Sequence, residues 1–160
     1  DRFIVLSLCM PAVAETVIRG GVSLSDQVPK GFFGTWKVTS VQTYTNNPSL
    51  FTERSTDYWN LSKDDDVITL SNPVSGAIAS VTVKAVKNNQ ITFTRRKKDR
   101  NENVTETPTL TLNGENFSGT DRIVIEKYKY GELVSTDIVE YKIDAVKVSG
   151  DGASKILGVR

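Results

Sequence analysis

The sequence predicts an all-β protein, an eight-stranded antiparallel up-and-down β-barrel. Three observations support this fold class. Thr and Val are frequent between residues 31 and 148, no apolar stripe of helical period persists there, and turn residues recur every eight to fifteen positions. Because the connections are short, neighbouring strands are expected to pair antiparallel, and a sheet of eight strands leaves no exposed edge when it closes on itself.

Turn signals separate most of the eight expected strands. In chain order the strands are Thr35 to Thr45, Thr56 to Ser62, Val67 to Ser71, Ala77 to Val86, Gln90 to Lys98, Val104 to Leu112, Asn116 to Tyr130, and Leu133 to Val148. The connectors are rich in turn-forming residues: Asn46-Asn47-Pro48, Lys63-Asp64-Asp65-Asp66, Asn72-Pro73 with Gly76, Asn88-Asn89, Asn113-Gly114, and Gly131-Glu132. Asn113-Gly114 is the strongest hairpin signal, because both residue types readily adopt the positive φ of a two-residue turn.

Alternation assigns faces on some strands, since successive side chains of a strand point to opposite sides of the sheet. One face of the fourth strand is expected to hold Ala79, Val81, Val83 and Ala85. On the sixth strand, the four threonines between residues 105 and 111 share one face and mark it as the solvent side.

The N-terminus indicates export. Arg2 precedes the mostly apolar run from Phe3 to Met10, and small residues end it at Ala14, which is the pattern of a cleaved secretory signal peptide. The run is far shorter than the roughly 20 residues of a membrane-spanning helix, so no transmembrane segment is expected. We therefore predict a secreted or periplasmic protein. Its expected parts are a signal peptide (1–14), a linker (15–30), a barrel domain (31–148) and a flexible tail (149–160).

Composition excludes many chemistries and partners. The chain has 20 Lys+Arg, 19 Asp+Glu and no His, and its one Cys, Cys9, lies in the predicted signal peptide. Without imidazole or a mature thiol, the usual general base, the Cys nucleophile and most metal ligands are missing, so no metal and no cofactor are expected. The near-neutral charge, and cations without interleaved aromatic residues, argue against a nucleic-acid partner.

Catalysis would have to depend on carboxylates, and we expect no enzyme. A glycosidase-like pair needs two carboxyl groups facing each other across a cleft, roughly 5 to 10 Å apart. The candidates are Asp57, Asp121, Glu126, Asp137 and Glu140. A carboxylate-dependent hydrolase is therefore kept as a remote alternative.

The first expected strand carries a family resemblance. The segment Gly31-Phe32-Phe33-Gly34-Thr35-Trp36 resembles the start of the lipocalin and fatty-acid-binding-protein (calycin) superfamily, whose first strand carries G-x-W. The resemblance implies a lipocalin-like domain of an exported bacterial protein: a β-barrel around a small apolar ligand, with Gly34 and Trp36 in the motif positions and Trp36 packed across the base. The Arg that stacks on this Trp in the family has no counterpart, and only Lys142 and Lys147 are available at the end of the chain.

The predicted function is non-covalent binding of a small hydrophobic or amphipathic ligand inside the barrel of a monomeric protein. Apolar side chains would supply affinity, and one or two polar groups would orient the ligand. The lining residues expected from alternation are Trp36, Val38, Trp59, Val81, Val83, Phe93, Phe117, Ile123 and Ile125.

An alternative is a structural or interaction module whose barrel is filled by its own side chains. Its contact site with an anionic surface would be the basic hairpin, which we define as Arg95, Arg96, Lys97, Lys98 and Arg100. Charges on both faces of this strand imply that it projects beyond the barrel rim, where water reaches both sides.

Overall fold

The structure, a computed structural model, describes residues 18–19 and 22–150. The predicted signal peptide and most of the predicted tail lie outside these residues. The described chain forms strands and two short 3-10 helices. In order these are β1 (Ile18–Arg19), β2 (Val22–Ser23), η1 (Leu24–Gln27), η2 (Lys30–Phe32), β3 (Gly34–Thr45), β4 (Arg54–Asp64), β5 (Val67–Ser71), β6 (Ile78–Lys87), β7 (Gln90–Lys98), β8 (Glu102–Asn113), β9 (Asn116–Lys129) and β10 (Glu132–Ser149).

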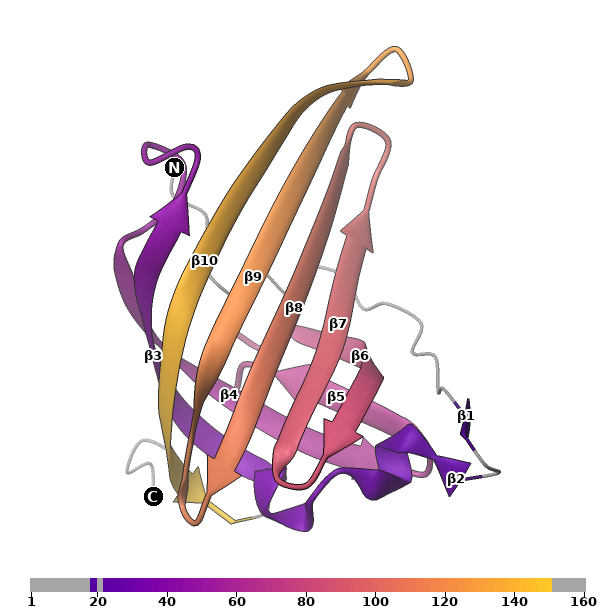
Figure 1. The fold of residues 1–160 in the computed structure, drawn as a ribbon, viewed down its shortest axis with the longest axis vertical. Coiled ribbons are helices and arrows are strands. Elements are labelled where there is room, and N and C mark those ends of the chain that lie inside the picture. Colours follow the sequence, from indigo (N-terminus) through magenta and orange to yellow (C-terminus); the bar gives the residue numbers. More distant parts are fainter. Residues whose placement is uncertain (1–17, 20–21, 151–160) are drawn as a thin grey trace.

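Strands β3 to β10 form one antiparallel sheet that closes in a ring (Figure 1). Each strand pairs with its neighbours in sequence, and β10 closes the ring by pairing with both β9 and β3. The prediction of an all-β chain with eight antiparallel strands is confirmed. The predicted ranges of β5 and β7 agree with the structure at both ends.

The turns follow the predicted chemistry. Positive φ occurs at Asp65, Asn88, Gly114, and at the successive residues Tyr130 and Gly131. Each of these positions lies in a two-residue connection between paired strands. Such turns require left-handed backbone, which Gly adopts freely and which Asn and Asp tolerate better than most residues.

The strands differ in height. The hairpins β7–β8 and β9–β10 rise well above the strands β4 to β6, and the β9–β10 turn is the farthest point of the sheet (Figure 1). Pairing between β6 and β7 extends only from Lys87 and Gln90 to Thr82 and Thr94. From Arg95 onward, toward the β7–β8 turn, β7 therefore pairs with β8 alone.

A register shift in β6 corrects one predicted face. The shift lies between Val83 and Ala85. Ala79, Val81 and Val83 are buried as expected, but Ala85 is exposed and Val86 is packed against the core instead. A bulge inserts one extra residue and so reverses the side to which all later side chains point.

The lower end of the ring is covered by the segment that precedes β3. Helices η1 and η2 lie beneath the sheet (Figure 1). Leu24 and Val28, both within the range predicted as a linker, belong to the buried core, and so does Phe32. This segment therefore packs onto the sheet and seals its base with apolar side chains.

Candidate binding site

The nine predicted lining residues come together in one buried cluster. Each of the nine is at most 4% exposed, and alternation along their strands turns them toward the inside of the ring. Their contact with a ligand stays a prediction. The packing that they share places both tryptophans of the chain, Trp36 and Trp59, inside the ring, where they pair across β3 and β4.

Three contacts hold the Trp36 indole at the lower end of the ring. Its indole Nε1 donates to the carbonyl of Phe32 at 2.8 Å, and the ring centroids of Trp36 and Phe117 are 4.5 Å apart. The ammonium of Lys147 lies 5.1 Å from the centroid of the Trp36 ring and donates to the carbonyl of Gly31 at 2.7 Å. Lys147, one of the two lysines available near the end of the chain, thus forms a cation–π contact with Trp36.

A polar cluster, Arg95, Glu106 and Asp121, lies inside the ring above this base. Arg95 and Glu106 face each other across β7 and β8, and Asp121 follows on β9. The Arg95 Nε and Nη2 atoms both donate to Glu106 Oε1, at 3.2 and 2.9 Å. Arg95 is 2% exposed, and neither carboxyl residue is exposed at all. Charges removed from water to this degree need partners for every polar atom.

Several atoms of this interior have no hydrogen-bond partner in the described part of the chain. These atoms are Arg95 Nη1, Glu106 Oε2, both carboxyl oxygens of Asp121, Trp59 Nε1 and Ser55 Oγ. Each buried polar atom left unpaired costs about 1–3 kcal/mol, and native proteins contain few of them. Here they are carried by four strands of the ring, β4, β7, β8 and β9.

The carboxyl groups outnumber the guanidinium. Burial raises the pKa of Asp121 well above its usual range, the negative charge of Glu106 raises it further, and Arg95 lowers it. Two carboxylates cannot hydrogen-bond each other without a proton, so a proton on Asp121 would be shared with Glu106. Burial also raises the pKa of the half-buried Asp57, and the charge of Glu106 adds to this effect.

Tyr141 closes the cluster on the β10 side. It pairs with Asp121 in the ladder, and its hydroxyl donates to the carbonyl of Thr52 at 2.9 Å. Thr52 belongs to the connection between β3 and β4, which also contributes the fully buried Phe51. Burial raises the pKa of the Tyr141 phenol. Tyr141 and this connection thus shield the carboxyl groups from water.

The predicted carboxylates divide between the two faces of the sheet. Asp121 and Asp137 are buried, and Asn47 Nδ2 donates to Asp137 Oδ1 at 3.0 Å. Glu140 pairs instead with Arg122 at 3.2 Å on the outside, and Glu126 is half-buried. Within residues 18–19 and 22–150, no group of acidic residues is arranged to hold a metal ion.

Glu106 was not among the predicted site residues, although its signal was present. It lies between Val104 and Leu110 on the buried face of β8, and the alternation of that strand places it inside. An acidic residue on an apolar face indicates a buried charge that needs a partner. The partner, Arg95, lies on the face of β7 that also carries Ile91 and Phe93.

The basic hairpin is only partly exposed, which corrects the prediction that water surrounds all its charges. Arg95 is buried in the ion pair with Glu106 and is unavailable to an outside surface. Arg96, Lys98 and Arg100 are exposed, and Lys97 is half-buried. The prediction failed at Arg95 because Glu106, opposite it on β8, pairs with its charge inside the ring.

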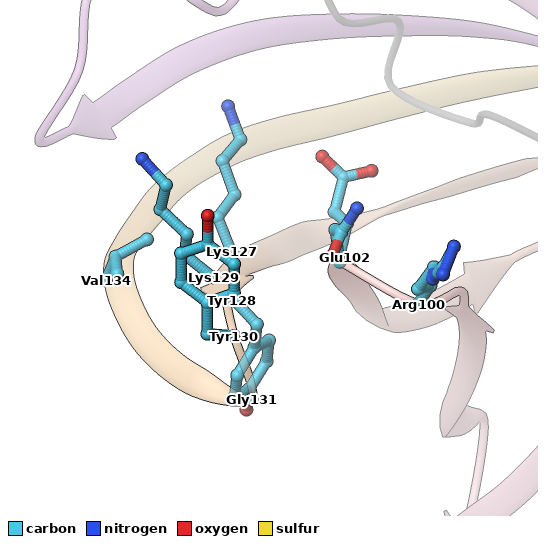
Figure 2. Close-up of a pocket in the computed structure, with 9 residues that line it drawn as sticks. Arg100, Glu102, Lys127, Tyr128, Lys129, Tyr130, Gly131 and Val134 are labelled. Carbon is cyan, nitrogen blue, oxygen red and sulfur yellow. The ribbon is translucent and has the colours of Figure 1, made fainter.

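A surface groove of about 810 Å³ runs between the two raised hairpins. Figure 2 shows Arg100 and Glu102 on one side of it and Lys127 to Gly131 on the other. Tyr130 at the turn is 95% exposed, and its neighbours Leu133 and Val134 are 52% and 58% exposed. The tips thus combine cations with exposed apolar side chains.

Comparison of the chain with family models, with curated proteins and with solved structures returned no match. No helix of the described residues has the length and apolarity needed to cross a membrane.

Proposed function

We propose that the protein is an exported, non-enzymatic binding protein that holds a small amphipathic molecule inside a lipocalin-like barrel. The observation that carries the proposal is the set of unpaired polar atoms around Arg95, Glu106 and Asp121. A ligand with a polar group would supply the partners that the described residues lack. The stacking of Lys147 on Trp36 adds support for the lipocalin-like architecture.

The arrangement of the interior suits an amphipathic rather than a purely apolar molecule. Along β9, the buried face runs from Phe117 at the base through Asp121 to Ile123 and Ile125. The polar cluster therefore lies between two apolar zones. Apolar contacts would supply affinity, and the cluster would orient the polar group.

Filling the interior is expected to weaken binding. We expect the purified chain to increase the fluorescence of N-phenyl-1-naphthylamine, a neutral apolar probe, in a saturable titration. Val38 is 1% exposed and faces inward beside Asp57, whereas the next residue, Thr39, faces outward. The variant Val38→Phe should lose about tenfold in probe affinity, because its ring takes ligand space, and Thr39→Phe should bind as the parent chain does. Equal affinities of the two variants, both with parental circular dichroism, would argue against an interior site.

The raised tips favour a second candidate function, contact with an anionic surface. Exposed Tyr130, Leu133 and Val134 lie beside the cations of the groove, a combination that suits a bilayer of anionic lipids. The cations would attract the headgroups, and the apolar side chains would enter the interface.

Binding to anionic vesicles is expected to depend on the exposed cations of the β7–β8 tip. We expect the chain to sediment with vesicles of phosphatidylglycerol and phosphatidylcholine at low salt and to be released at about 1 M salt, where screening shortens the reach of charges to about 3 Å. The variant Arg96→Ser/Lys98→Ser/Arg100→Ser should lose most of this binding, since each cation contributes about 1 kcal/mol.

The matched control removes three exposed cations away from the tips, Lys37→Ser/Lys84→Ser/Lys142→Ser. It has the same net charge as the tip variant, so its binding to the vesicles should remain. Equal loss in both variants would indicate a general effect of net charge and would rule out a docking site at the tips.

A further inference from the structure

The interior site has more unpaired acceptor atoms than unpaired donor atoms, and more carboxyl groups than guanidinium groups. Glu106 acts on both Asp57 and Asp121, whereas the one guanidinium, Arg95, pairs with Glu106 and acts on Asp121. The unpaired acceptor atoms are Glu106 Oε2 and both oxygens of Asp121, whereas the unpaired donors are Arg95 Nη1 and Trp59 Nε1. Ser55 Oγ can act in either way.

Among the residues that the structure describes, Arg95 is the one cation that acts on Asp121. The groups that act on it are Glu106 from β8 and Arg95 from β7, and its ladder neighbour on β10 is Tyr141, whose hydroxyl is already donated to Thr52. Lys97 lies two residues beyond Arg95 on the same face of β7, but it is not among the charges that act on Asp121. Two of the three guanidinium nitrogens of Arg95 already donate to Glu106.

Resting on the proposed function, we infer that the interior site selects an amphipathic amine, or more weakly an alcohol, and rejects a carboxylate. An ammonium group supplies three donors and one positive charge. Its charge would stabilise ionised Asp121, whose proton would leave to solvent, and its donors would pair Asp121 and Glu106 Oε2. A hydroxyl supplies one donor and no charge. A carboxylate ligand brings a further negative charge next to Glu106, so like-charge repulsion opposes it, and it offers no donor to the unpaired carboxyl oxygens.

The test is displacement of N-phenyl-1-naphthylamine by three ligands that share one alkyl chain: dodecylamine, 1-dodecanol and dodecanoate. At neutral pH and below micelle formation, dodecylamine should bind about tenfold or more tightly than dodecanoate, with the alcohol between them. The variant Asp121→Asn removes the carboxyl group that an ammonium would ionise but keeps the shape, and it should bring the amine and the carboxylate within about threefold of each other.

The control variant is Asp144→Asn, which removes a carboxylate from the outer face of β10, where its side chain is 60% exposed. It should keep the parental preference, because outer charges are screened by water. Dodecanoate binding as tightly as dodecylamine, or a preference unchanged in Asp121→Asn, would overturn the inference and leave the proposed interior site standing. Failure of the probe and of all three ligands to bind would overturn both.

Discussion

Replacing Arg95 by Met is expected to lower the free energy of unfolding by about 3–5 kcal/mol. The guanidinium is the cation that directly pairs with Glu106, and the Glu106 and Asp121 carboxyl groups are fully buried. Met keeps much of the side-chain volume but leaves both carboxyl groups without compensation. Because a buried unpaired charge cannot recover its hydration, the loss is far larger than for an exposed ion pair. Urea unfolding followed by circular dichroism measures it.

Two further variants separate this effect from other causes. Arg96, the next residue on β7, points outward and is exposed, so Arg96→Met should change the stability by no more than about 0.5 kcal/mol. Removing both members of the pair, in Arg95→Met/Glu106→Met, should recover part of the loss, since it also removes the carboxylate that the single variant leaves unpaired. Additive losses in the double variant would contradict the role assigned to the ion pair.

The strands and turns were predictable because they depend on local signals. Turn residues and runs of β-branched residues located all eight strands of the ring, and Asn113-Gly114 marked the β8–β9 turn. The face assigned to Ala85 was wrong because a bulge depends on how two strands meet, which alternation within one strand does not contain.

The apolar interior was predictable for the same reason, and the polar cluster was not. Alternation placed Trp36, Phe93 and Ile123 inside, where the structure also has them. Arg95 stands in a run of cations, so its sequence context indicated solvent. Its burial depends on Glu106, which lies eleven residues later and meets Arg95 only through the register of β7 and β8. Predicting such a pair requires knowing the register of the two strands, which composition does not reveal.

Gly119 shows the same dependence on neighbouring strands. It lies in the interior of β9, opposite Leu110 of β8 and Ile143 of β10. A Cβ atom added to Gly119 would lie 1.9 Å from the carbonyl oxygen of Thr109 and 3.0 Å from the Cα of Leu110. Both contacts are with backbone, which cannot swing aside as a side chain can. Glycine is therefore required here by the close approach of β8.

Gly119→Ala is accordingly expected to destabilise the protein by about 3 kcal/mol or more, the upper end of what overpacking costs. That loss corresponds to a fall in melting temperature of about 6–12 °C for a chain of this size. The neighbouring Ser118 is exposed on the outer face of β9, and Ser118→Ala should shift the stability by no more than about 0.5 kcal/mol. If Gly119→Ala melts with the parent chain, β8 and β9 are farther apart than this geometry requires. The same pair of strands also places Glu106 opposite Ile123, two residues from Asp121, so the position of Glu106 relative to Asp121 would then need revision too.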